Sequence, residues 1–181
     1  MGTQRRRPQR RRSARNYSVP WSVLPWKRVA LGVVVLYLAL QAYPLFIHSA
    51  AGKVASSWNA AMLWGVLKAI GQSPSLDGPA VVSGAVRFFV IPECTIFAPM
   101  ALFTAGVLVF PSSLPEKLRA LAVGVLCLSL MNLLRLMTLY AVLETSPGMF
   151  EAVHLFIWQP VMAMTALVLW GLWAAKRTRH A

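Results

Sequence analysis

Four long apolar runs dominate the hydrophobic pattern of the chain. A helix needs about 20 largely apolar residues to cross a bilayer, and an α-helix satisfies its own backbone hydrogen bonds there. Runs of this kind extend over about 29–47, 95–110, 118–143 and 153–175. The second run is short for a span, but the loop residues before it can add to its length. The pattern therefore predicts an all-α integral membrane protein with about four transmembrane helices.

Residues 48–94, between the first two runs, have a mixed pattern. The stretch 54–70 predicts an amphipathic helix that lies at the membrane surface, and a fifth span of low hydrophobicity is the alternative. Its apolar stripe consists of Val54, Trp58, Met62, Gly65 and Ala69. QSPSLDGP is typical of a turn, and AVVSGAVRFFVIP predicts two short strands around Ser83-Gly84. We therefore expect an amphipathic helix and a short β-hairpin, which lead the chain to Cys94.

The composition supports a membrane location. Hydrophobic residues make up 57% of the chain and charged residues 13%, and the mean hydropathy is +0.59. Soluble domains contain about 45–50% apolar and about 25% charged residues. The chain is therefore too poor in charge to fit the soluble globular class.

Positive charge is concentrated at the start of the chain. The formal net charge is +13, and nine of the 18 lysines and arginines precede Val29, with no acidic residue among them. A free arginine-rich arm can bind nucleic acid, but this arm leads directly into an apolar run. We therefore interpret residues 1–28 as a cytoplasmic arm that sets the topology and contacts anionic lipid, and we expect no nucleic-acid partner.

The other basic clusters give the orientation of the predicted spans, because lysine and arginine accumulate in cytoplasmic loops. With the arm inside, Lys117 and Arg119 and the basic tail 176–181 fall on the same side. The opposite side receives the acidic residues Asp77, Glu93, Glu144 and Glu151. We expect a multi-pass protein of the inner (cytoplasmic) membrane, with both termini cytoplasmic and one transmembrane domain over 29–175.

The two cysteines, Cys94 and Cys127, are too few for a disulfide framework. The sequence contains no CxxC or HExxH motif and no cluster of Cys with His, and so we expect neither a metal nor another cofactor. Cys127 lies among Leu and Val and fits an inert thiol, and His48 fits a polar residue at a wet boundary. Cys94 differs, because it stands between an acidic residue and a long apolar run.

In this topology, three side chains that could take part in catalysis lie at the same membrane depth. Cys94 stands at the outer end of the second run, His154 opens the fourth, and Arg135 lies about 12 Å inside the outer end of the third. Taken alone, Cys94 could be an inert buried thiol, and Arg135 could extend its side chain to the membrane surface. However, an arginine within an apolar helix costs about 2.5–3.5 kcal/mol to insert and usually has a function. Asn132 and Thr138 share its helix face.

These residue types fit nucleophilic catalysis by a thiol. A thiol attacks a carbonyl as the thiolate, and a neighbouring imidazolium or guanidinium lowers its pKa. His154 can return the proton to the departing amine, while Arg135 can hold the oxyanion of the tetrahedral intermediate. Glu151, one turn before His154, can orient the imidazole, and a plain interfacial acid is the alternative. Glu93 would raise the pKa of Cys94, and we assign it no catalytic part.

At these residues the sequence resembles the exosortase and archaeosortase family of multi-pass membrane cysteine transpeptidases. The resemblance rests on Cys94-Thr95 at the start of a span, on the N-x-x-R motif that ends at Arg135, and on His154 at the start of the last span. It covers about residues 88–173. It implies that Cys94 is the nucleophile, that Arg135 binds the oxyanion and that His154 is the acid/base.

The resemblance also implies a substrate class. Such substrates are exported proteins that end in a short motif, a transmembrane helix and a basic cytoplasmic tail. They would be cleaved at the motif, and the acyl group would pass through an acyl-enzyme to water or an amine at the cell surface. The expected partners are therefore a tail-anchored protein and membrane lipid.

A second function, of a different class, uses the same residues. In it the protein is a non-catalytic membrane assembly or transport subunit, and Arg135 binds an anionic ligand. Cys94 is essential to the first function and silent in the second. The two functions are therefore separable by substitution of the thiol.

Overall fold

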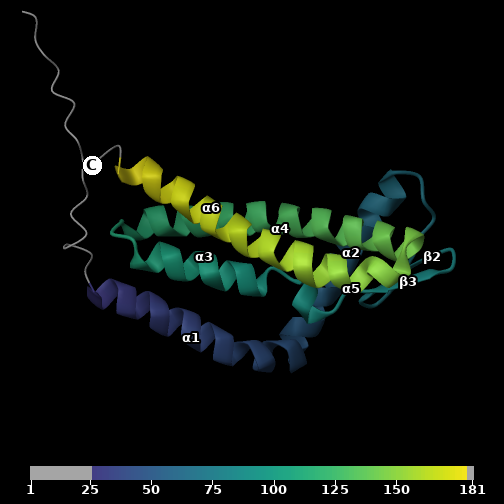
Figure 1. Cartoon of the computed structure of the whole chain (residues 1–181), viewed down its shortest axis with the longest axis horizontal. Helices are drawn as coiled ribbons and strands as arrows, with labels where there is room; N and C mark the ends of the chain where they lie inside the picture. Colours follow the sequence, from purple (N-terminus) through teal and green to yellow (C-terminus); the bar gives the residue numbers. More distant parts are fainter. Residues whose placement is uncertain (1–25, 179–181) are drawn as a thin grey trace, which may run out of the picture.

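The computed structural model describes residues 26–178, which form a bundle of helices with a small sheet at one end (Figure 1). The predicted basic arm, apart from its last three residues, lies outside the described residues, as do residues 179–181 of the predicted tail. The elements in chain order are α1 (Trp26–His48), α2 (Ala50–Ala69), β1 (Ser75–Asp77), β2 (Ala80–Ser83), β3 (Val86–Phe89), η2 (Pro92–Cys94), α3 (Phe97–Val109), α4 (Leu114–Thr145), η3 (Pro147–Met149), α5 (Phe150–Ala152), η4 (Val153–Trp158) and α6 (Gln159–Thr178).

Within residues 26–178, three helical stretches are long and apolar enough to cross a membrane: Val29–His48, Leu114–Thr145 and Pro147–Arg177. They indicate a multi-pass membrane protein. The second predicted run forms α3, whose 13 residues are apolar but extend only about 20 Å, less than the hydrocarbon core of a bilayer. Pro111 follows the C-cap residue Phe110 and has no N–H to continue the helix, which explains the early end. The structure therefore has three candidate spans and a shorter apolar helix where we expected about four spans.

Helix α2 forms where an amphipathic helix was predicted, and it is not among the three candidate spans. Val54 and Trp58 of the predicted apolar stripe are exposed. A different face packs against the bundle, and it contains Gly52, Ser56, Asn59, Ala60, Leu63 and Leu67. Three of these six residues, Gly52, Ser56 and Ala60, are small and let the backbone of α2 come close to its neighbours. The outward stripe remains compatible with a helix that lies on a membrane surface.

The sheet has three antiparallel strands in the order β1-β2-β3. The predicted hairpin is confirmed, since Ser83 pairs with Val86 around Gly84, which has a φ of 58°. The prediction that QSPSLDGP is only a turn was wrong, because its residues 75–77 form β1. Gly78, with a φ of 55°, turns the chain so that Asp77 pairs with Ala80. A strand of three residues is too short to produce a hydrophobic pattern, and it forms because β2 offers a free edge.

Close packing at glycines fixes the short helix α3 between α4 and α6. A Cβ at Gly106 would overlap the indole of Trp170, and a Cβ at Gly124 would overlap the ring of Phe103. Around these contacts lies an apolar cluster that includes Phe103, Val107, Leu128 and Ala166. A second cluster joins α2, the sheet and α4, and it includes Leu63, Val81, Phe88, Cys94, Leu139 and Tyr140. The second cluster anchors the loop that carries Cys94.

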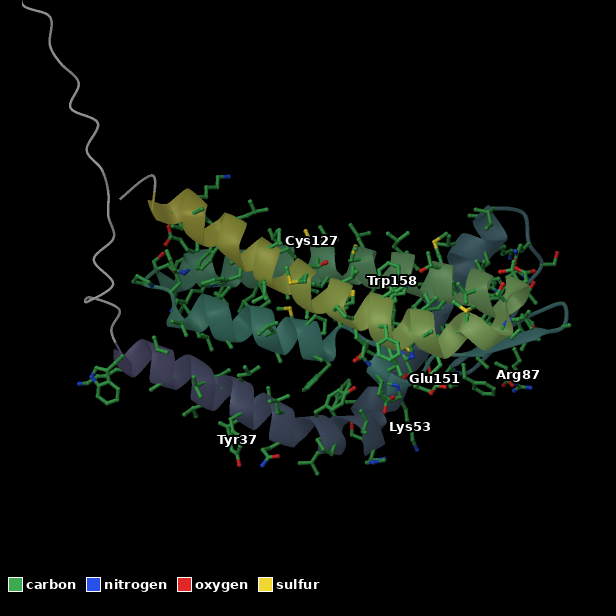
Figure 2. All side chains as sticks on the ribbon, in the orientation of Figure 1. Tyr37, Lys53, Arg87, Cys127, Glu151 and Trp158 are labelled. Carbon is green, nitrogen blue, oxygen red and sulfur yellow. The ribbon has the colours of Figure 1, made fainter. Side chains whose placement is uncertain are left out.

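The two ends of the bundle differ in their elements and charges. The start of α1, the turn between α3 and α4, and the end of α6 lie at one end, while α2, the sheet and α5 lie at the other (Figure 1). The first end therefore carries both basic clusters, at 117–119 and 176–177, as expected if they lie on one side of a membrane. Figure 2 shows Lys53, Arg87 and Glu151 toward the sheet end and Cys127 farther along the bundle. We call these the basic end and the sheet end.

The corner between α1 and α2 gives a test of this packing. Ser49 caps α2 by accepting a hydrogen bond from the Gly52 N–H at 3.0 Å, and a Cβ at Gly52 would collide with the backbone carbonyl of Phe46. Gly52→Ala should therefore destabilise the protein by about 1–3 kcal/mol. Gly65→Ala in the same helix is the matched control, because its new methyl meets nothing within 4 Å. It should stabilise by about 0.5–1 kcal/mol through helix propensity. Thermal unfolding in detergent measures both, and an equal response would contradict the close corner.

Candidate active site

Cys94 is held at the end of a short 3-10 turn, η2, between β3 and α3. Pro92 opens the turn, and the Cys94 N–H donates to the Ile91 carbonyl at 2.8 Å. The Thr95 hydroxyl donates to the Pro92 carbonyl at 2.7 Å, which fastens the other side of the turn. The thiol is buried, with 2% of the residue exposed. Its position is therefore set by the backbone of the turn and by the surrounding core.

The side chain of Asn132, on α4, joins this turn to two helices. Its Nδ2 donates to the Cys94 carbonyl and to the Asn59 Oδ1, each at 2.8 Å. Asn132 is completely buried, and a buried amide that uses both donor protons fixes its neighbours in one arrangement. The N-x-x-R motif thus includes a residue that positions the backbone of Cys94.

Asn59 is a residue of the site that the sequence analysis did not find. It lies on the buried face of α2, and its own Nδ2 donates to the Ala55 carbonyl at 2.8 Å, which leaves Oδ1 to accept from Asn132. The available signal was an amide on a helix face that is otherwise small or apolar. That signal is weak alone, because the partner, Asn132, is 73 positions away in the sequence.

His154 is carried by a π-helical segment, η4, at the start of the last long helix. Pro160 follows this segment, and a proline has no N–H to donate to the carbonyl four residues earlier, at Phe156, and its ring crowds that carbonyl. Widening the preceding turn to a π-helix relieves this conflict, and such turns often occur at functional sites. The Phe150 ring packs beside the imidazole, with centroids 5.9 Å apart.

The structure brings Cys94, Arg135 and His154 into contact. The Sγ of Cys94 lies 3.8 Å from Nε2 of His154, and Nη2 of Arg135 lies 2.7 Å from the same nitrogen. A guanidinium can only donate hydrogen bonds, so Nε2 must accept. The imidazole in this arrangement is therefore neutral and carries its proton on Nδ1. Nε2 has a single lone pair, so the Cys94 thiol and Nη2 of Arg135 compete for the same acceptor.

The other candidate residues lie outside this contact. Glu151 is exposed, and in the part of the chain that the structure describes it makes no hydrogen bond to the His154 ring. Thr138 donates to the backbone carbonyls of Leu134 and Arg135, both at 2.9 Å. Cys127 lies away from the sheet end (Figure 2). Within residues 26–178, no group of three His, Cys, Asp or Glu side chains could hold a metal ion.

A cavity of about 380 Å³ adjoins the contact, between α1, α3 and α6. Its polar side chains are those of Tyr43, Glu93, Thr95, Arg135 and Gln159, and its other walls are apolar, with Leu36, Leu40, Leu102 and Met162 among them. We call it the Arg135 cavity. It reaches Arg135 and the two neighbours of Cys94 in the chain, while Cys94 itself does not line it. Its volume falls in the range of small-ligand sites.

Arg135, which lines this cavity, is not fully hydrogen-bonded. The residue is 3% exposed, and its Nε has no hydrogen-bond partner among the described residues. Buried polar atoms almost always have partners, so an orphaned one marks a place where a ligand or water is expected. Arg135 therefore has spare hydrogen-bonding capacity beside a cavity with the volume of a small-ligand site.

Burial sets the acidity of the nucleophile candidate. It raises the pKa of the Cys94 thiol, Arg135 and the backbone N–H contact at Ile91 oppose that rise, and Glu93 adds to it. The net direction is upward, which is the reverse of the lowering expected from the sequence, because desolvation outweighs the nearby guanidinium. The resting group is therefore a thiol, and it needs a base during attack.

The asparagine pair is testable by a double-mutant cycle. Asn59→Leu and Asn132→Leu should each destabilise the protein by about 1–3 kcal/mol, because each leaves a buried polar partner unsatisfied. The double variant should lose less than the sum, with a coupling energy of about 0.5–3 kcal/mol. Equilibrium unfolding in mixed micelles gives the four values. Strict additivity would show that the 2.8 Å contact does not link the two helices.

The pH dependence of Cys94 alkylation tests the charges around the thiol. In a Cys127→Ala background, the rate of reaction with iodoacetamide should rise with pH around a midpoint above the usual thiol range, because the Cys94 pKa is raised. Arg135→Gln removes a lowering influence and should move the midpoint to higher pH. Glu93→Gln removes a raising influence and should move it to lower pH. Shifts in the same direction for both variants would contradict these assignments.

Comparison of the chain with protein-family models, with curated proteins and with solved structures gives no match. The resemblance to exosortases and archaeosortases thus rests on the motif residues of this chain. The activity and the substrate class that the resemblance implies are accordingly proposals.

Proposed function

We propose that the protein is a membrane-embedded cysteine protease or transpeptidase of the exosortase type. The observation that carries the proposal is the shared contact at His154 Nε2, which accepts from Arg135 and lies 3.8 Å from the Cys94 sulfur. A nucleophile, a base and an electrostatic group converge there from three separate elements. This is the set that acyl transfer by a thiol requires.

The first step is attack of Cys94 on a peptide carbonyl. Because burial keeps the thiol protonated at rest, His154 acts as a general base and takes the S–H proton onto Nε2 as the C–S bond forms. The carbonyl π electrons move to oxygen, which becomes the oxyanion of a tetrahedral intermediate. Asn132 holds the Cys94 carbonyl, so that the sulfur keeps its position relative to the imidazole.

Proton transfer changes the partner of Arg135. Once His154 carries a proton on Nε2, that nitrogen is a donor, and it can no longer accept from Nη2 of Arg135. The two groups also become like charges. The guanidinium is thereby released to donate to the oxyanion, together with its unpaired Nε. In this mechanism the same event that activates the thiol frees the group that stabilises the intermediate.

Collapse of the intermediate completes the acyl transfer. The C–N bond breaks, the imidazolium of His154 gives its proton to the departing amine, and a thioester remains on Cys94. Water or an amine then attacks the thioester, with His154 as base, and releases the thiol. The identity of the acceptor decides between proteolysis and transpeptidation.

The substrate class is inferred from the resemblance and from the Arg135 cavity. We propose that the substrate is an exported protein with a C-terminal motif, an apolar helix and a basic end. The apolar walls of the cavity suit a membrane segment, and Tyr43, Glu93 and Gln159 suit the polar peptide beside it. The acidic residues near the sheet end and the basic clusters at the other end favour an extracytoplasmic site in the inner membrane.

One observation favours the second function, a transport or assembly subunit that binds an anion. The cavity reaches Arg135, but Cys94 does not line it and is 2% exposed. A ligand with an anionic group could therefore bind Arg135 without contact with the thiol. Substitution of Cys94 separates the two functions.

Processing of a tagged reporter tests the proposal. The reporter is an exported protein that carries a C-terminal motif, apolar helix and basic end from the same genome, and cleavage is followed by gel mobility. Cys94→Ala and His154→Ala should abolish processing, and Arg135→Gln should slow it by about 10²–10³-fold. Cys127→Ala is the matched control and should process normally.

Membrane insertion of each variant is checked by alkaline extraction. Normal processing by an inserted Cys94→Ala protein would refute the enzyme. If Arg135→Gln lost function while Cys94→Ala kept it, the result would support the anion-binding subunit instead.

A further inference from the structure

A second cavity lies at the basic end of the bundle, far along α4 from the candidate active site. Its volume is about 410 Å³. We call it the basic groove, and its walls include Phe103, Arg119, Val123, Leu169, Trp173 and Lys176. These side chains come from α3, α4 and α6, so the groove runs between a shorter apolar helix and two candidate spans.

Apart from its basic residues, the groove is lined by apolar and small residues. Small residues of α4, Ala120 and Gly124, line its floor, and the Phe103 ring lies against Gly124. Val123 is 56% exposed at its side, which leaves the groove open toward the surroundings of the bundle. An acyl chain that enters from the bilayer would therefore meet an apolar surface along its length.

The outer part of the groove carries an excess of positive charge. Arg177 forms an ion pair with Glu116, with Nη1 and Oε1 2.5 Å apart. Arg119 and Lys176 are exposed and form no ion pair within residues 26–178. Three cations and one carboxylate thus give this rim a formal charge of +2. The neighbouring Lys117 is occupied, because its Nζ donates to the Leu108 carbonyl at 3.0 Å.

We propose that the basic groove binds an anionic phospholipid. Arg119 and Lys176 hold the phosphate, and an acyl chain lies between Val123 and Leu169. Basic pockets between membrane helices are suited to anionic head groups, and Trp173 beside the cations matches the preference of tryptophan for head-group depth. Both the charge and the lining of the groove fit an anionic phospholipid. The basic rim attracts the phosphate, and the apolar floor suits the acyl chain.

Lipid binding in the basic groove does not depend on the proposed enzyme function. The groove lies at the opposite end of α4 and uses none of the residues that contact the thiol. Lipid binding and substrate processing are measured separately, and so failure of either proposal leaves the other standing. A lipid held between α4 and α6 would, however, contact the helix that carries Arg135 and the helix that continues from η4, which carries His154.

Lipid affinity of the purified full-length protein tests the proposal. Native mass spectrometry with dioleoylphosphatidylglycerol and dioleoylphosphatidylcholine gives the dissociation constants for an anionic and a zwitterionic lipid with the same chains. Arg119→Gln/Lys176→Gln should weaken phosphatidylglycerol binding by about 30-fold, since two surface charges are lost. The control Lys53→Gln/Lys68→Gln removes two lysines of α2 at the sheet end and should change it less than about twofold.

Steric variants test the chain-binding part without a change in charge. Val123→Trp should fill the groove and weaken phosphatidylglycerol binding. Val125→Trp places the same side chain on an exposed position of α4 outside the groove and should not. Equal affinity for the two lipids, or equal losses in the groove and control variants, would overturn the proposal. Displacement of the lipid by an equal concentration of glycerol 1-phosphate would overturn it as well, because it would show a site for a free phosphate.

Discussion

The hydrogen bond from Arg135 to His154 is the interaction on which the candidate site depends. A guanidinium that is 3% exposed within an apolar helix is costly, and it persists only where its donors find acceptors. Here the acceptor at 2.7 Å is a neutral imidazole and not a carboxylate. Arg135 has no carboxylate partner among the described residues, so its charge is not neutralised. That leaves a positive potential beside a thiol, at a point where a negative charge would develop during acyl transfer.

The geometry also distinguishes between two ways of activating a cysteine: a permanent thiolate, and a thiol beside a neutral base. A standing thiolate needs enough nearby positive charge to overcome desolvation, and at Cys94 burial has the larger effect on the pKa. A thiol with an adjacent neutral base needs no such balance, because the proton moves only during attack. The 3.8 Å approach of His154 Nε2 to the sulfur fits the second way. In the proposed mechanism the thiol is therefore unreactive until His154 takes its proton.

Helix α4 links both ends of the molecule. At the sheet end it supplies Asn132 and Arg135, and at the basic end it supplies Arg119 and the floor of the basic groove. Its start is fixed by a capping box between Ser113 and Glu116, and Glu116 also pairs with Arg177 of α6. An ion pair thus links α4 to α6 at the basic end, in addition to the apolar packing between them. At the sheet end Arg135 of α4 contacts His154 of η4, the segment that leads into α6.

The sequence alone determined the membrane class, the positions of the long apolar helices, the β2–β3 hairpin and the three residues that meet at His154. These follow from local signals: hydrophobic length, turn glycines, and reactive side chains at one expected depth. Only the tertiary structure decided which face of α2 is buried, that β1 pairs with β2, that Asn59 meets Asn132, and that the turn before Pro160 is π-helical. The balance of effects on the Cys94 pKa was decided there too. The physical reason is that burial, edge pairing and hydrogen bonds between distant residues depend on what packs against a segment, and the segment's own pattern does not contain that information.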